Sequence, residues 1–193
     1  RQGYVQGNAF YHPDMRFHFN VPNGWKLENT PRQVTMAAPQ NKALIILMAE
    51  NSTQSLDTYA VKLKKEFANS RILDERFGTI NGFNAFRSSL YMEPDSGNQK
   101  GEPVNIGISC IRKEGLVFSF VSVTKESDYS SYSYSINRTV NSFNVLRGSR
   151  FTRKRPKRVR VMRVNRAQAL RFFLSKRGIP NKFWKKIALI NNV

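Results

Sequence analysis

Cysteine and histidine are scarce in this chain of 193 residues, and their scarcity excludes several kinds of site. Cys110 is the single cysteine, so the chain has no internal disulfide and no cysteine-based zinc site. It follows Ile106 and Ile108 in an alternating apolar run and is predicted to be a small core residue. His12 and His18 lie far from it, and neither begins an HExxH motif. We therefore predict no catalytic residue, no metal ligand and no cofactor, and a chain that is not an enzyme.

Long apolar runs are also missing. The longest, Ala43–Ala49, has the length of a strand and is far shorter than the roughly 20 residues that cross a bilayer. No transmembrane segment and no N-terminal signal pattern are predicted. The chain begins at Arg1 rather than at Met, so we expect it to be a mature or excised fragment of a larger protein.

Acidic residues are absent from the last quarter of the chain. All 13 Asp and Glu lie between Asp14 and Asp128. The 47 residues from Arg147 to Val193 contain 16 Lys and Arg and therefore carry +16, which leaves +3 of the net +19 for the first 146 residues. This asymmetry indicates an interaction with an anionic partner.

Strand and helix periodicities alternate along residues 1–146 and favour an α+β domain with a mostly antiparallel sheet flanked by helices. Residues 10–30 are predicted to form a hairpin around Pro22-Asn23-Gly24. One helix is predicted from Ser55 to about residue 68 and another over Tyr129–Phe143. The remaining predicted strands are Val34–Ala38, Ala43–Ala49, Ile72–Thr79, Phe83–Tyr91, Val104–Lys113 and Leu116–Val123.

The composition changes abruptly after residue 146. Residues 147–157 are predicted to be a basic linker. Residues 158–193 are predicted to be a small basic βαα unit with a strand around Val159–Val164, a helix from Asn165 that ends at Gly178, and a helix over Lys182–Ile190. This unit is below the size that usually folds alone.

Two stretches resemble known families. Phe10–Asp14, followed by Phe17-x-Phe19-x-Val21-Pro22-x-Gly24-Trp25, resembles the start of PsbP-like domains, in which an extended segment leads into a VP-x-GW hairpin. The resemblance continues through the predicted helix starts and hairpins and covers about 140 residues. It implies a PsbP-like α/β/α sandwich.

The run Arg1-Gln2-Gly3-Tyr4, together with Lys42-Ala43-Leu44, is similar to the C-terminal region of HtpX-like zinc metallopeptidases of bacterial envelopes. In that family a LysM-like part follows the PsbP-like part, and residues 158–193 resemble a LysM unit without its last strand. Asn165-Arg166-Ala167 stands where LysM units carry Gly-Asp-Thr. The resemblance implies a periplasmic or secreted accessory region whose peptidase domain lies upstream and whose ligand is peptidoglycan or another anionic envelope polymer.

The basic residues of the C-terminal part are the predicted anion-binding site. Dense Lys and Arg suffice to attract phosphate-type groups, whereas a solvated basic linker is the competing interpretation. The helix–turn–helix pattern of residues 167–190 leaves an alternative open, in which the chain is a nucleic-acid-binding protein and its last helix is the recognition helix. The candidate residues are Arg153, Lys154, Arg155, Lys157, Arg158, Arg160, Lys182, Lys185 and Lys186.

Overall fold

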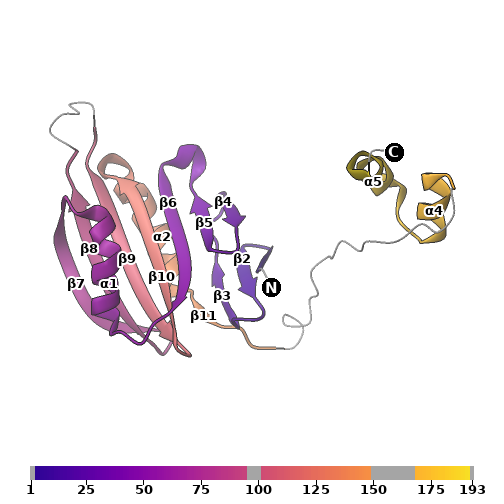
Figure 1. The fold of residues 1–193 in the computed structure, drawn as a ribbon. Coiled ribbons are helices and arrows are strands. Elements are labelled where there is room, and N and C mark those ends of the chain that lie inside the picture. The colour runs from indigo at the N-terminus through magenta and orange to yellow at the C-terminus, as the bar shows by residue number, and fades with distance from the viewer. Residues whose placement is uncertain (1–2, 95–100, 149–167, 192–193) are drawn as a thin grey trace. The chain divides into compact units, whose positions relative to one another are not determined.

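The computed structural model describes residues 3–94, 101–148 and 168–191. The chain forms two compact units, Arg1–Arg155 and Pro156–Val193, and each is described by itself. The first unit consists of two antiparallel sheets and two helices, and the described part of the second consists of a pair of short helices (Figure 1). The first unit thus has the predicted α+β, mostly antiparallel architecture.

Seven antiparallel strands form the larger sheet. Alternating apolar residues explain these strands: in β9 the buried Ile106, Ile108 and Cys110 point to one face and Ile111 lies in the core of the other. Asn81-Gly82 forms the tight turn between β7 and β8, with positive φ at both residues. In spatial order the strands are β4 (Lys26–Asn29), β5 (Gln33–Ala37), β6 (Ala43–Asn51), β10 (Leu116–Lys125), β9 (Val104–Lys113), β8 (Phe83–Met92) and β7 (Ser70–Ile80).

A smaller sheet carries the N-terminal segment. Its order is β1 (Tyr4–Gln6), β2 (Ala9–His12), β3 (Phe17–Asn20) and β11 (Asn144–Val145). The predicted hairpin over residues 10–30 is therefore wrong, because β3 pairs with β2 and β4 belongs to the larger sheet. Phe17 and Phe19 are buried against the larger sheet, and the Pro22–Gly24 turn carries the chain from one sheet to the other.

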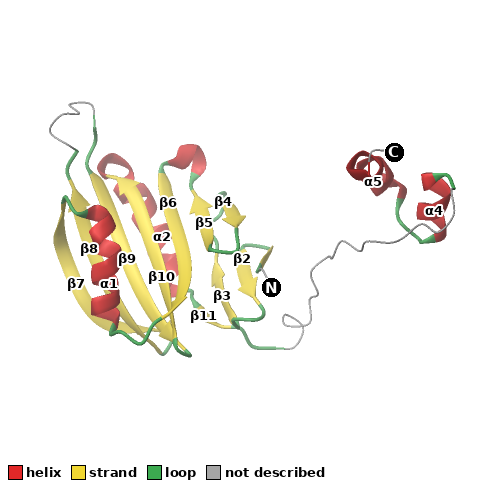
Figure 2. Cartoon of the chain, viewed as in Figure 1, coloured by secondary structure: helices red, strands yellow, loops and turns green. Residues whose placement is uncertain are grey.

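The two helices of the first unit cover opposite faces of the larger sheet (Figure 2). Helix α1 (Leu56–Lys64), extended by the 3-10 turn η2 (Lys65–Phe67), packs Leu56, Tyr59 and Ala60 on one face. Helix α2 (Glu126–Asn141) packs Ile136 and Val140, with the smaller sheet, on the other. The predicted helices are thus confirmed, although α2 begins three residues earlier than Tyr129.

Candidate anion-binding surface

Helix α4 (Leu170–Lys176) opens the described part of the second unit and ends in a well-formed cap. Gly178 has φ of +67°, its N–H donates to Ser175, and the Ile179 N–H donates to the Leu174 carbonyl oxygen at 3.0 Å. This is a Schellman motif, with Ile179 following Gly178 and Leu174 buried beneath. The predicted end of the helix at Gly178 is confirmed. Helix α4 begins at Leu170 with Ala169 as its N-cap, and the predicted start at Asn165 lies outside the described residues.

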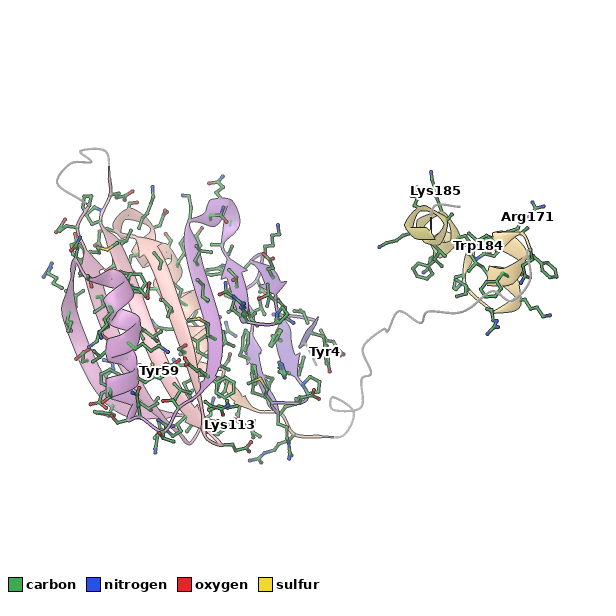
Figure 3. The ribbon with its side chains drawn as sticks, in the orientation of Figure 1. Tyr4, Tyr59, Lys113, Arg171, Trp184 and Lys185 are labelled. Carbon is green, nitrogen blue, oxygen red and sulfur yellow. The ribbon has the colours of Figure 1, made fainter. Side chains whose placement is uncertain are left out.

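The second helix is fixed to this turn by its tryptophan. Pro180 precedes the 3-10 turn η3 (Asn181–Phe183), which leads into α5 (Trp184–Asn191). The Trp184 Nε1 donates to the Ile179 carbonyl oxygen at 2.7 Å. Figure 3 shows the Trp184 side chain on the side of α5 nearer α4, with Lys185 pointing away. The apolar residues therefore hold the helix pair together and leave the charged residues outward.

Six cations and no carboxylate lie in residues 168–191. All six side chains are exposed, so their charges add without internal neutralisation. Arg177 lies over the Phe173 ring at 5.4 Å and Lys182 over the Phe183 ring at 5.3 Å. Phe172, beside them, is 62% exposed. We call this set the basic surface, and its cations are Arg171, Lys176, Arg177, Lys182, Lys185 and Lys186.

Three of the nine predicted site residues belong to the basic surface. Lys182 lies in η3, and Lys185 and Lys186 lie on α5, all three exposed. The strand predicted around Val159–Val164 lies outside the described residues, as do the other six predicted site residues. These are Arg153, Lys154, Arg155, Lys157, Arg158 and Arg160.

Sequence reasoning missed three cations of the basic surface and one cleft. Arg171, Lys176 and Arg177 lie on or beside α4. The sequence signal that could have included them in the predicted site is that they are basic residues in a segment without carboxylates. A polar cleft of about 450 Å³ lies in the first unit, and Asn8 and Asn23 hydrogen bond to each other within its lining at 2.9 Å. Its lining includes Arg138 and no carboxylate, which suits neutral polar or anionic groups.

Cys110 and the two histidines are parts of the scaffold. Cys110 is fully buried, as predicted, and burial raises the pKa of its thiol to about 12, which keeps it protonated and unreactive. His12 accepts a hydrogen bond from the Met15 N–H at Nδ1 and stacks on Phe17. His18 stacks on Tyr11. The two histidines lie on adjacent strands, His12 on β2 and His18 on β3.

These histidines predict how stability depends on pH. Burial lowers the pKa of both His12 and His18 below the ordinary 6.5. Below about pH 6.5 the unfolded chain therefore binds more protons than the folded chain, and stability falls as the pH falls. We expect the urea concentration at the midpoint of unfolding of the first unit to decrease between pH 7 and pH 5. Circular dichroism monitors the unfolding.

The double variant His12→Asn/His18→Phe is the matched control for this titration. Asn retains an acceptor for Met15 and Phe retains the stacking on Tyr11, so the urea midpoint should become flat over the same interval. Hydrogen bonds from Lys62 and Lys64 lower the pKa of the Glu50 and Glu75 carboxyls, so most of their effect on stability falls below pH 5. An unchanged slope in the double variant would show that other groups control the response.

Within residues 3–94, 101–148 and 168–191, no group of three or more His, Cys, Asp or Glu side chains is arranged to hold a metal ion. Over the same residues, no helix is both long enough and apolar enough to cross a membrane.

The first unit has the PsbP-like α+β fold, which places the chain in a structural class rather than in a sequence family. No protein-family model matches the chain, and no curated protein matches it by sequence. The resemblance is instead to solved structures that share 12–14% of their residues with this chain, an identity at which the likeness concerns the fold alone.

Three solved structures represent this class. The cyanobacterial PsbP protein of Synechocystis has a TM-score of 0.57 and 12% identity, over 74% of this chain and 96% of its own. The Ran-binding protein Mog1p of Saccharomyces cerevisiae has a TM-score of 0.52 and 14% identity, over 74% and 97%. LpqN of Mycobacterium tuberculosis, involved in cell envelope biogenesis, has a TM-score of 0.50 and 14% identity, over 68% and 83%.

Proposed function

We propose that this chain is a non-catalytic accessory module whose basic C-terminal part docks on an anionic polymer or surface of the bacterial cell envelope. In this proposal the PsbP-like domain is the scaffold, and the module serves a periplasmic or secreted HtpX-like zinc metallopeptidase whose catalytic domain lies upstream. The proposal follows the PsbP-like fold of the first unit and the similarity of Arg1–Tyr4 to that peptidase family.

The charge distribution is the observation that carries the docking function. The basic surface presents six exposed cations and no neutralising carboxylate, and the charge of the whole chain is concentrated in the same C-terminal part. Exposed Phe172 and Phe183 lie among these cations. Cations attract anionic groups at long range, and exposed aromatic rings add apolar contact once the surface is reached.

Co-sedimentation of the full chain tests the docking function. We expect it to pellet with purified peptidoglycan sacculi or with vesicles that contain phosphatidylglycerol, and not with vesicles of phosphatidylcholine alone. Raising the salt from about 0.05 M to about 0.5 M should release it, because screening shortens the reach of the charges. Failure to pellet with either anionic material at low salt would refute the docking function.

The peptidase parentage has a separate test. An HExxH-containing domain encoded in the same reading frame directly upstream of Arg1 is the expected finding. A reading frame without such a domain would refute the parentage and leave the docking function untouched.

A nucleic-acid-binding protein is the second candidate function. It is favoured by the helix–turn–helix-like succession of α4, the Gly178 turn and α5, with Lys182, Lys185 and Lys186 on the second helix segment. A gel-shift titration with duplex DNA at about 0.15 M salt separates the two functions. Tight binding to DNA, without binding to envelope material, would favour this candidate.

A further inference from the structure

Strand β7 is an unusually exposed edge of the larger sheet. It is the last strand in the sheet order, it has 11 residues, and it pairs with β8 along one side. All nine residues from Arg71 to Thr79 are exposed. No strand in the described part of the chain pairs with its other side, so alternate N–H and C=O groups there are available for a further strand.

Large apolar side chains lie on this edge. Ile72, Leu73 and Phe77 are 54%, 49% and 66% exposed. Ile72 pairs with Leu90 and Phe77 with Phe86, and both partners belong to the core beneath α1. Leu73 precedes Phe77 by four positions and so shares its face, and the bulge between Ile72 and Asp74 brings Ile72 to that face as well. The edge therefore presents an apolar patch beside α1, the kind of surface that marks an interaction site.

The side chains of β7 complement one another about Glu75: the residues one position away on its two sides are oppositely charged, and those two positions away are both apolar. Leu73, Asp74, Glu75, Arg76 and Phe77 run apolar, acidic, acidic, basic, apolar. Asp74 and Arg76 form an exposed ion pair with one another at 3.1 Å. Glu75 is bound to Lys64 of α1 and accepts a hydrogen bond from Ser88, so its charge is already neutralised within the chain.

We propose that β7 pairs in antiparallel register with β7 of a second copy of this chain, about a two-fold axis through Glu75. In this register Asp74 lies opposite Arg76 of the second copy, twice over, and Leu73 lies opposite Phe77. The two Glu75 carboxylates meet at the axis with a Lys64 beside each. The apolar patches of the two copies then continue each other on one face of a joined sheet.

Neighbouring registers are less favourable. The apolar faces of the two strands stay on the same side of the joined sheet only if the two-fold axis passes through a residue, so the axis can move only from one residue to the next. An axis at Asp74 puts Asp74 opposite its own copy, and an axis at Arg76 does the same for two guanidinium groups. Like charges directly opposite each other destabilise a strand pair. The Glu75 axis also brings two carboxylates together, but each is already paired with a Lys64, and this register alone of the three sets Asp74 opposite Arg76.

Sedimentation velocity of the full chain over a range of concentrations tests the pairing. We expect a reversible equilibrium between one and two chains. Either single reversal, Asp74→Arg or Arg76→Asp, places like charges opposite each other at two positions and should raise the Kd of the dimer by about ten- to a hundredfold. The double variant D74R/R76D restores opposite charges and should recover the wild-type Kd.

A cross-link identifies the axis independently. Opposed residues of antiparallel strands have Cα atoms about 4.5–5.5 Å apart, within reach of a disulfide. Glu75→Cys should therefore form a disulfide between copies under mild oxidation. Thr79→Cys should not, because its two copies would lie about 27 Å apart. A chain that stays monomeric at every concentration, single reversals without effect on the Kd, or efficient cross-linking at position 79 would each overturn the proposal.

Discussion

Replacing Phe143 by Ala is expected to lower the free energy of unfolding of the first unit by about 3–5 kcal/mol. The Phe143 ring is fully buried directly after α2, where the chain passes from the helix to β11. Removing it leaves a cavity that rigid neighbouring rings cannot fill. The measurement is urea denaturation, monitored by the circular dichroism signal of the strands.

The position of Phe143 explains this large effect. Its ring lies 5.4 Å from Phe17 of the smaller sheet, 5.8 Å from Phe83 on β8, and 5.0 Å and 6.0 Å from Phe118 and Phe120 on β10. One side chain thus joins both sheets to the end of α2. Each aromatic pair of this kind adds about 0.5–1.5 kcal/mol beyond the area it buries.

Tyr134→Ala is the matched control for this prediction. Tyr134 is also an aromatic residue, on α2, but it is 72% exposed, so its truncation should change the free energy of unfolding by about 0.5 kcal/mol or less. A loss below about 1 kcal/mol for Phe143→Ala would mean that the two sheets are held together without this ring.

The elements that were predicted well depend on local patterns. Strand β9 has the predicted bounds Val104–Lys113, because its apolar residues alternate over its whole length. Asn81-Gly82 lies between the predicted strands Ile72–Thr79 and Phe83–Tyr91, and its residue types favour the positive φ of the turn found there. Gly178 likewise ended α4 as predicted, since a glycine completes the Schellman motif.

The division into two sheets depends on contacts between distant residues. Strand β11 has two residues and pairs with β3, more than 120 positions earlier. The Asn20 N–H, at the end of β3, donates to the Ser142 hydroxyl at 2.7 Å. Strands this short have no periodicity of their own, so the local pattern favoured a simple hairpin between β3 and β4.

The candidate sites show the same contrast. Lys182, Lys185 and Lys186 were predicted because three lysines within five residues are a dense basic group that is visible in the sequence. All three are exposed, as a basic surface requires. The polar cleft joins residues 6–23 to residues 134–139. Asn8 and Arg138 have no sequence relation, and only the packing of the smaller sheet beside α2 brings them to one cleft.

Neutralising three lysines of the basic surface is expected to weaken binding to anionic vesicles by about a hundredfold. The variant is Lys182→Gln/Lys185→Gln/Lys186→Gln. Each basic residue near an anionic membrane contributes about 1 kcal/mol, and three such losses correspond to about two powers of ten in affinity. Glutamine is a good helix former, so α5 should keep its structure.

The matched control removes three charges from the first unit instead. Lys26, Arg32 and Lys65 are all exposed, and the triple change of these residues to Gln gives a chain with the same net charge as the first variant. If net charge alone attracted the chain to anionic vesicles, the two variants would lose the same amount of binding affinity. Because the proposed contact is local, the control should lose less than about threefold at about 0.15 M salt, where charges farther than about 8 Å from the surface are screened. Equal losses in the two variants would show that the basic surface is not the docking site.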